Sequence, residues 1–305
     1  MFRFYPKSLL PKPLLPHALL LVALIVSGIA TPARAAEEMR AGGKLLLTGG
    51  ISTVDGSAGG GLASWALIAG NETSDGIGGT AHVTAVPLAD YSLTSEGVAI
   101  GIRDRLELSY AHQSFDTQKV GAALGLGRGF TFRQDIVGAK LRIAGDAVID
   151  QDSAMPQIAI GVQYHIAARD AVIHAVGGAH DTGTDFYVSA TKLLLAESLV
   201  LNGTLRLTKA NQFGLLGFGG DRDDRYSAQF EGSAGLLLTR RLLVGGEVRT
   251  KPDNLRFARE DKALDAFAAY AVSRNLTATV AYVDLGDIAT VRNQRGAFLS
   301  LQAGF

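Results

Sequence analysis

The sequence contains no cysteine, and only 19% of its 305 residues are charged. Without cysteine there is no disulfide framework, no thiolate metal site and no cysteine nucleophile. Long hydrophobic runs are also missing, because beyond residue 36 no apolar run comes near the ~18 residues that a membrane-spanning helix needs. If the chain resides in a membrane, it must therefore cross it as a β-barrel.

An excess of basic charge is also absent. The chain has 29 Lys and Arg against 29 Asp and Glu. Its first 35 residues hold Arg3, Lys7, Lys12 and Arg34 but no acidic residue, which leaves 25 basic and 29 acidic residues in the remainder. This balance gives no electrostatic support for nucleic-acid binding.

Residues 1–35 have the order of a secretory signal peptide: basic residues, an apolar core, and small residues that end at Ala35. Cleavage is expected after Ala35. An uncleaved anchor is the alternative, because the apolar count over 14–30 approaches the ~17-residue lower limit for a spanning helix. Pro16 and His17 argue against that alternative.

From Gly97 onward, apolar residues recur at every second position in runs of about ten residues. This is the period of a strand whose two faces differ. In the run 199–208, one face is mostly leucine, whereas Asn202, Thr204 and Arg206 lie on the other. The same alternation appears at 137–143, 156–166 and 241–251.

Very short connections join these runs in pairs, as at Arg103-Asp104, Arg240 and Ser273-Arg274. Longer polar stretches separate the pairs, at 116–131, 167–184, 209–225, 252–262 and 286–295. Short turns that alternate with long loops around ~10-residue strands are typical of an outer-membrane β-barrel. A soluble β-sandwich is the alternative, but its strands are usually about five or six residues long and its outward face should be charged.

Twelve antiparallel strands are predicted, an even number as in bacterial barrels. They are expected near 61–70, 91–102, 105–115, 132–144, 156–166, 185–194, 199–209, 226–238, 241–251, 263–272, 275–285 and 296–305. The predicted domains are thus a signal peptide (1–35), a glycine-rich segment (36–60) and a barrel (61–305). Residues 36–60 have two open alternatives. They form a plug inside the lumen, or they add a strand that pairs with another strand near 79–88, which gives a barrel of fourteen strands.

Four stretches carry a resemblance to known proteins: SAGGGLASWALIAG (57–70), GVAIGIRDRLELSYAHQSFD (97–116), AYVDLGDIA (281–289) and GAFLSLQAGF (296–305). They resemble an uncharacterised family of proteobacterial outer-membrane proteins that is defined only as a domain of unknown function. This resemblance implies a β-barrel in the bacterial outer membrane and brings no activity with it. The terminal alternation of Leu301, Ala303 and Phe305 also resembles the signal by which barrel-assembly machinery recognises its clients.

The face opposite the apolar one is expected to line the lumen. Its predicted pore-lining residues are Lys140, Arg142, Gln163, His165, Arg206, Glu231, Glu247, Arg249 and Lys251. Mixed charges on an inner wall can border a water-filled passage or form a salt-bridged network that fills it. Since barrels of about eight strands are filled and those of about 16 to 18 are open, twelve strands predict a narrow or partly plugged pore.

The functional hypothesis is a narrow passive channel for small polar solutes. The alternative is a non-transporting barrel that supports the envelope or binds a partner. Besides the unidentified solute, the expected partners are outer-membrane lipid and the barrel-assembly machinery, and no nucleic acid. No cofactor is expected.

No enzymatic activity is expected either. His112, Ser114 and Asp116 alternate on one face, which invites the idea of a hydrolase. Residues two apart along a strand are ~6.5 Å apart, however, too far for a direct hydrogen bond between nucleophile and base. These residues also continue the phase of Leu108, which is expected to face lipid.

No metal site is expected. His174, His180 and Asp181 lie in one predicted loop, but their spacing matches no known ligand set.

Overall fold

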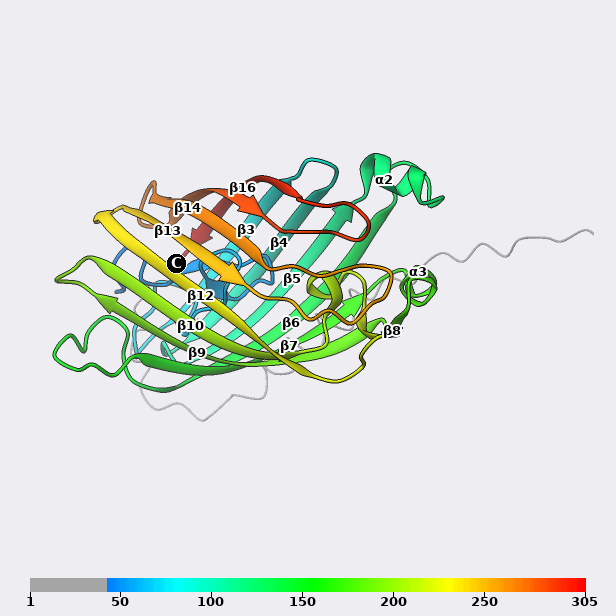
Figure 1. The fold of residues 1–305 in the computed structure, drawn as a ribbon. Helices are drawn as coiled ribbons and strands as arrows, with labels where there is room; N and C mark the ends of the chain where they lie inside the picture. The colour runs from blue at the N-terminus through cyan, green and yellow to red at the C-terminus, as the bar shows by residue number, and fades with distance from the viewer. Residues whose placement is uncertain (1–42) are drawn as a thin grey trace, which may run out of the picture. The chain divides into compact units, whose positions relative to one another are not determined.

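A computed structural model describes residues 43–305, which form an all-β barrel (Figure 1). The expected signal peptide and the first part of the glycine-rich segment lie outside the described residues. No helix among residues 43–305 is long and apolar enough to cross a membrane.

Twelve antiparallel strands close into the barrel. They are β3 (Ile77–Pro87), β4 (Ser92–Ile102), β5 (Leu106–Asp116), β6 (Thr131–Ala144), β7 (Gln157–Ala167), β9 (Thr182–Leu194), β10 (Leu199–Thr208), β12 (Ser227–Thr239), β13 (Leu242–Arg249), β14 (Ala263–Ala271), β15 (Leu276–Asp284) and β16 (Arg295–Gly304). The last strand, β16, pairs with the first, β3, and places Leu301 opposite Val83. The apolar C-terminal strand therefore forms the closing seam, which leaves the sheet without a free edge.

Side chains along each strand alternate between the two faces of the wall. On β10, the outward Leu201 and Leu205 are 42% and 50% exposed, whereas Asn202, Thr204 and Arg206 point inward and are buried. An apolar outer face with a polar inner face is the pattern of a barrel that faces lipid. The prediction of an antiparallel barrel of twelve strands is confirmed.

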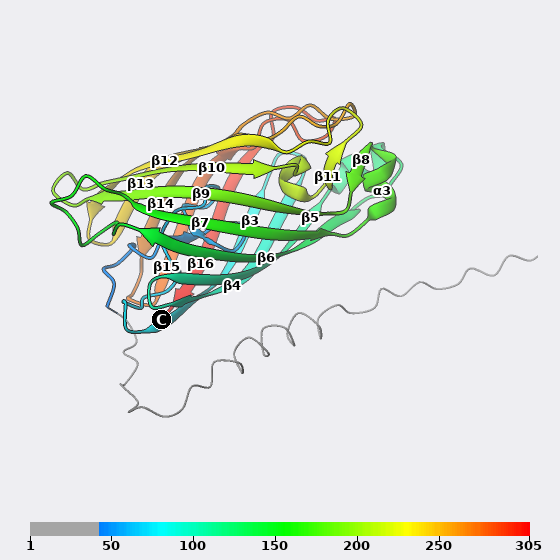
Figure 2. The same cartoon turned by 90° about the horizontal axis from the view of Figure 1, so that it is seen from below.

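The two ends of the barrel differ. The turn end carries the connections 103–105, 145–156, 195–198, 240–241 and 272–275, together with Phe305. The loop end carries the connections 88–91, 117–130, 168–181, 209–226, 250–262 and 285–294. Figure 2 shows that the small elements of the loops gather at the loop end. These are α2 (Gln118–Ala123), α3 (Asp170–Ala175), β8 (Gly178–His180), η1 (Asn211–Gly214) and β11 (Phe218–Gly220).

The first predicted strand is wrong. Residues 61–70 form no barrel strand, and the barrel begins at β3. The hydrophobic pattern was misleading there because Leu62, Trp65 and Leu67 are buried inside the barrel and do not face lipid. The other eleven predicted strands match β4 to β16, so the count of twelve is correct although its first member is not.

Residues 43–76, named the plug here, precede β3 and run inside the lumen (Figure 1). Two short strands, β1 (Ile51–Ser52) and β2 (Ala58–Gly59), pair within it. Every residue from 51 to 70 is buried. Gly56 has a φ of 90°, and a Cβ there would lie 3.0 Å from the Cβ of Ala111 on β5. Glycine therefore suits both the backbone conformation and the close approach of the plug to the wall.

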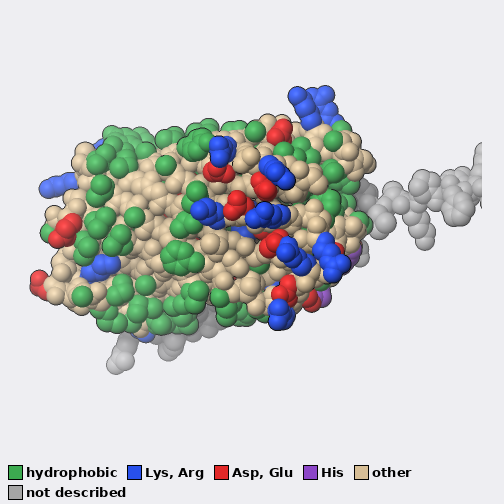
Figure 3. Space-filling model, viewed as in Figure 1, with side chains coloured by type: hydrophobic (Ala, Val, Ile, Leu, Met, Phe, Trp, Pro, Cys, Tyr) green, Lys and Arg blue, Asp and Glu red, His purple; other side chains and the backbone are tan. Residues whose placement is uncertain are grey.

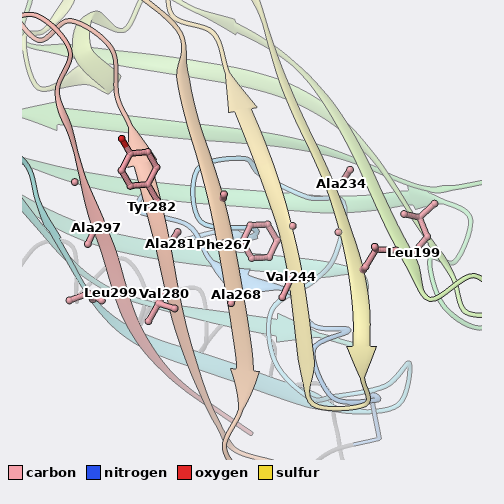
Figure 4. Close-up of a pocket in the computed structure, with 15 residues that line it drawn as sticks. Leu199, Ala234, Val244, Phe267, Ala268, Val280, Ala281, Tyr282, Ala297 and Leu299 are labelled. Carbon is pink, nitrogen blue, oxygen red and sulfur yellow. The ribbon is translucent and has the colours of Figure 1, made fainter.

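Charged side chains gather towards the loop end of the outer surface (Figure 3). Over β12 to β16 many outward side chains are small, among them Ala234, Ala266 and Ala268, and they leave a shallow hollow lined also by Tyr282 (Figure 4). Most of the outer surface towards the turn end thus presents apolar or small side chains.

The longest connection at the turn end, residues 145–156, covers a cation. Lys192 lies in the outward phase of β9, yet it is buried. Its Nζ donates hydrogen bonds to the backbone oxygens of Asp150 (2.5 Å) and Met155 (3.4 Å). The connection therefore satisfies a charge that would otherwise face lipid.

Candidate functional site: the plugged interior

Three carboxylates of the wall bind the backbone of the plug: Glu107 on β5, Glu231 on β12 and Glu247 on β13. Glu247 Oε2 accepts hydrogen bonds from the backbone N–H groups of Leu62 (2.8 Å) and Ala63 (3.4 Å). The remaining donors are Ala58 and Ala69 to Glu107, and Ser64 to Glu231. Because the plug is mostly irregular, several of its N–H groups have no backbone partner, and the wall supplies their acceptors.

Lys140 on β6 satisfies backbone oxygens of the plug. Its Nζ donates to Ala58 (3.0 Å) and Leu67 (2.8 Å) and pairs with Glu107 at 3.1 Å. Both charged side chains are almost completely buried. A buried pair of this kind is stable only when hydrogen bonds satisfy the remaining polar atoms, and here the plug provides them.

Two arginines connect the plug to several strands at once. Arg249 on β13 pairs with Asp55 of the plug at 2.7 Å and donates to the backbone oxygen of Leu62 at 3.1 Å. Arg206 on β10 pairs with Glu231 at 2.5 Å and donates to Ser64 Oγ at 3.0 Å. Further partners of Arg206 are Asp185 and Gln163.

Trp65, the only tryptophan of the sequence, lies in the plug. Its Nε1 donates to Ser233 Oγ at 2.8 Å and to Glu247 Oε1 at 3.3 Å. The ring is buried, so its fluorescence would report on the docking of the plug.

Ion pairs also hold the start of the plug at the turn end. Lys44 pairs with Asp104 at 2.8 Å, and Arg142 pairs with the same carboxylate at 2.8 Å. Lys44 Nζ is also 3.5 Å from Glu72 Oε1. Burial raises the pKa of Glu72 to about 7, although the Lys44 ammonium opposes this shift.

At the loop end, the segment 209–220 closes the lumen. Two cations lie over the ring of Phe213 in η1. The guanidinium carbon of Arg249 is 4.6 Å from the ring centroid, and Lys251 Nζ is 5.4 Å from it. Lys251 also pairs with the buried Glu260 at 3.2 Å, and burial raises the pKa of Glu260 against this attraction. Apolar side chains surround a small cavity of about 60 Å³ there, among them Tyr91, Leu93, Phe115, Phe132, Leu215, Leu216 and Ile288.

The predicted pore-lining residues lie on the inner face of the strands, except that Lys251 follows β13 in the loop-end connection 250–262. Lys140, Gln163, His165, Arg206, Glu231, Glu247, Arg249 and Lys251 are buried. Arg142 is half-buried at the turn end. Five of them contact the plug directly: Lys140, Arg206, Glu231, Glu247 and Arg249. The plug occupies the space that these side chains border.

Sequence reasoning missed several acidic partners. Glu107 lies between the outward Leu106 and Leu108, and Asp185 precedes the outward Phe186, so their inward phase was present in the sequence pattern. Asp55 had no such signal, because the plug has no regular period. The predicted pore-lining set holds five basic and two acidic residues, and Glu107, Asp185 and Asp55 bring the two signs to equal numbers.

The residues considered for a hydrolase lie outward, as predicted. The spacing argument is wrong for His112 and Ser114, because Ser114 Oγ is 3.4 Å from His112 Nε2. The ~6.5 Å spacing applies to the backbone positions of residues 112 and 114. The imidazole of His112 extends along the strand and brings Nε2 close to the Ser114 hydroxyl. Asp116 does not join them; its Oδ1 accepts a hydrogen bond from the backbone N–H of Gln118.

The loop histidines contact different partners. His174 Nδ1 is 2.9 Å from the backbone oxygen of Gly178, and His180 Nε2 is 3.7 Å from Asp224. Within residues 43–305 no group of three or more metal-ligating side chains comes together.

A closed twelve-stranded barrel with an apolar outer face, a polar inner face and an N-terminal plug defines a transmembrane β-barrel of the outer-membrane type. The sequence matches the family described as Protein of unknown function (DUF3034) over residues 48–302, and the chain belongs to that family. The resemblance stated from the sequence is confirmed. No curated protein matches the sequence.

Several solved structures are similar in fold at low sequence identity. The KdgM porin has a TM-score of 0.49 and 10% identity, covering 74% of this chain and 99% of its own. The Acinetobacter baumannii outer membrane protein Omp33 has a TM-score of 0.43 and 7% identity, covering 74% and 97%. Outer membrane phospholipase A from Escherichia coli has a TM-score of 0.41 and 6% identity, covering 74% and 92%. Porin and phospholipase are activities of the named proteins, and the similarity to this chain is one of fold.

Proposed function

We propose that the protein is a passive outer-membrane channel for small polar solutes, which the plug keeps closed. The observation that supports this proposal is the chemistry of the contact between plug and wall. Much of it consists of hydrogen bonds and ion pairs, such as those of Glu247, Lys140 and Arg249. The wall would stay polar if the plug moved, and a polar wall suits water and small polar solutes.

The second candidate is a non-transporting barrel. The apolar residues at the loop end favour it, because Leu215, Leu216 and Phe115 close the lumen a second time. A solute would need both closures to open. Conductance measurements distinguish the two candidates.

The experiment compares three forms of the mature protein in planar lipid bilayers. The wild type is expected to be silent or to open rarely. Arg249→Ala removes both the partner of Asp55 in the plug and the guanidinium over Phe213 at the loop end, so it is expected to give frequent conductance steps. Ala66→Cys combined with Thr191→Cys adds a tether, because the backbone nitrogen of Ala66 is 2.8 Å from Thr191 Oγ1.

The tethered protein should be silent when oxidised and should behave as wild type when reduced. The natural chain has no cysteine, so the disulfide has no competitor. Channel function is rejected if Arg249→Ala gives no conductance steps while its Trp65 emission shows that the plug has left its site. The non-transporting barrel would then be the better description.

Export and assembly are parts of the same proposal. Removal of residues 1–35 would release a mature chain that begins at Ala36, and N-terminal sequencing of protein from the outer-membrane fraction tests this. The outward Leu301, Ala303 and Phe305 would bind the barrel-assembly machinery. Phe305→Ala is expected to lower the amount of assembled barrel, with outward Leu236→Ala on β12 as the control.

A further inference from the structure

Two rows of polar side chains lie on the outer face of β4, β5 and β6, near the loop end. Strand register places Glu96, His112 and Asp135 in one row, and Thr94, Ser114 and Arg133 in the next. One step towards the turn end, the row consists of Val98, Tyr110 and Val137. The same boundary on three strands marks the level where the apolar outer face gives way to polar side chains.

Within these rows, three side chains form a continuous chain of hydrogen bonds. His112 Nδ1 is 2.9 Å from Asp135 Oδ1, and Ser114 Oγ is 3.4 Å from His112 Nε2. A proton on Nδ1 that is donated to the carboxylate leaves Nε2 as an acceptor for the serine hydroxyl. The order is that of a nucleophile, a general base and a group that orients the base.

The carboxylate has a second partner. Tyr110 donates its hydroxyl to Asp135 Oδ1 at 2.7 Å, so Asp135 is held from two directions. The side chains of His112 and Asp135 are 31% and 35% exposed, which leaves the site open on its outer side. Nothing within the described residues covers it.

Arg133 supplies a positive charge beside the nucleophile. It is the cross-strand partner of Ser114, and such partners have Cβ atoms about 4.5–5.5 Å apart. Its side chain is exposed and makes no hydrogen bond or ion pair with any residue in 43–305. A guanidinium that is free to turn towards Ser114 can stabilise an oxyanion formed there.

We propose that Ser114, His112 and Asp135 form an esterase site that hydrolyses carboxylic esters of membrane lipids. The class of substrate follows from the level of the site on the wall. Lipid ester groups lie between the hydrocarbon core and the headgroups, and the site lies where the outer face changes from apolar to polar. This activity is independent of conduction through the lumen.

The proposed reaction needs only water as a second reactant. Ser114 Oγ attacks the ester carbonyl carbon while His112 Nε2 takes the hydroxyl proton, and Arg133 stabilises the oxyanion. The bond from the acyl carbon to the alcohol oxygen then breaks, and His112 returns the proton to that oxygen. Water attacks the acyl-serine with His112 as base, which releases a fatty acid and restores the Ser114 hydroxyl.

The test measures ester hydrolysis by the purified mature protein. One arm uses vesicles of phosphatidylethanolamine and phosphatidylglycerol that carry a fluorescent acyl chain; the other uses a soluble short-chain ester. Ser114→Ala and His112→Ala are expected to lower kcat/KM by about 10³-fold or more. Arg133→Ala is expected to lower it by about 10²–10³-fold.

Matched controls come from the same face of the barrel. Thr94→Val removes the hydroxyl next to Ser114, and Asp116→Asn neutralises the next outward carboxylate of β5. Both should keep wild-type rates. A fluorophosphonate probe should label the wild type at Ser114, leave Ser114→Ala unlabelled and react slowly with His112→Ala. A difference in SDS gel mobility between heated and unheated samples confirms that each variant is assembled.

The proposal is overturned if the wild type neither hydrolyses vesicle lipid nor takes the probe. It is also overturned if Ser114→Ala retains the wild-type rate. Hydrolysis of the soluble ester alone would refute the assignment of membrane lipids as substrate.

Discussion

Strand β5 carries polar side chains on both of its faces, and their surroundings differ. Its inner Glu107 is completely covered and is bonded to two N–H groups of the plug and to Lys140. Its outer His112 and Ser114 are partly exposed and bond to each other and to Asp135. The strand thus belongs to two polar clusters, one on each face of the wall.

The inner cluster is required by the backbone it surrounds. An irregular segment inside a barrel has N–H and C=O groups that need partners, and each missing partner costs about 1–3 kcal/mol. Glu107, Glu231, Glu247, Lys140 and Arg249 provide them. Their charges therefore satisfy the plug backbone while the plug is docked.

The outer cluster has no such requirement. The backbone of β4, β5 and β6 is already paired in the sheet. Apolar side chains at these outward positions would suit a lipid-facing wall equally well. Polar groups that the fold does not need, placed in a geometry suited to catalysis, point to a function on the outside of the barrel.

The largest expected effect is on the inner cluster. Arg249→Ala would leave Asp55 buried without its partner, which should lower the free energy of unfolding by about 3–5 kcal/mol. Denaturant titration in detergent would measure this loss, and Trp65 emission should shift to longer wavelength as the plug undocks. Arg225→Ala, which removes an exposed ion pair with Asp223 at the loop end, is the control and should behave as wild type. Equal unfolding midpoints for the two variants would contradict a structural role for the inner cluster.

A smaller effect is expected from pH through Glu72. The unfolded chain releases this proton near pH 4.5, whereas the folded chain keeps it up to about pH 7. Between these values the folded state binds more protons, so stability falls as pH rises through the window and is level above it. Unfolding midpoints measured from pH 4 to 8 should show this slope, and Glu72→Gln should remove it. An unchanged slope in the Glu72→Gln variant would assign the pH dependence to other groups.

Neutral contacts of the plug should contribute less. Thr204→Val removes the hydroxyl that donates to the backbone oxygen of Ser64 at 2.6 Å. That oxygen keeps a hydrogen bond from Asn202, so we expect a loss of about 0.5–1.5 kcal/mol. Trp65 fluorescence during urea unfolding would measure the difference. Thr94→Val on the outer face is the matched control, and a loss as large there would show that both faces contribute alike.

The period of two in the sequence was sufficient for most of the wall. It located eleven strands and assigned the inward phase of residues such as Arg206 and Glu231. It failed at 61–70, because a plug buried by the barrel is apolar for reasons unrelated to lipid. It placed a strand near β3 only in the fourteen-strand alternative (79–88), and the outward residues of β3 include the small Ala81 and Ala85.

The contacts of both clusters were harder to predict. Partners such as Asp55 with Arg249 join an irregular segment to a strand 194 residues away, and no local pattern encodes that pairing. For the outer cluster, the backbone spacing of two residues along a strand does not give the distance between side-chain atoms, because the imidazole of His112 extends towards Ser114. Asp135 lies on the next strand, and its position beside His112 depends on the register of β5 and β6, which the local sequence does not encode.

The smallest effect on stability is expected where the largest effect on activity is proposed. Ser114→Ala and Asp135→Asn change half-exposed groups, and such substitutions usually alter stability by no more than about 0.5 kcal/mol. In Asp135→Asn the new amide oxygen can still accept the hydrogen bond from Tyr110, so the wall should keep its structure. Unfolding midpoints equal to wild type, together with lost hydrolysis, would separate the outer cluster from the inner one. A large loss of stability in both variants would instead mean that these side chains hold β5 and β6 together, and the difference between the two faces of the wall would disappear.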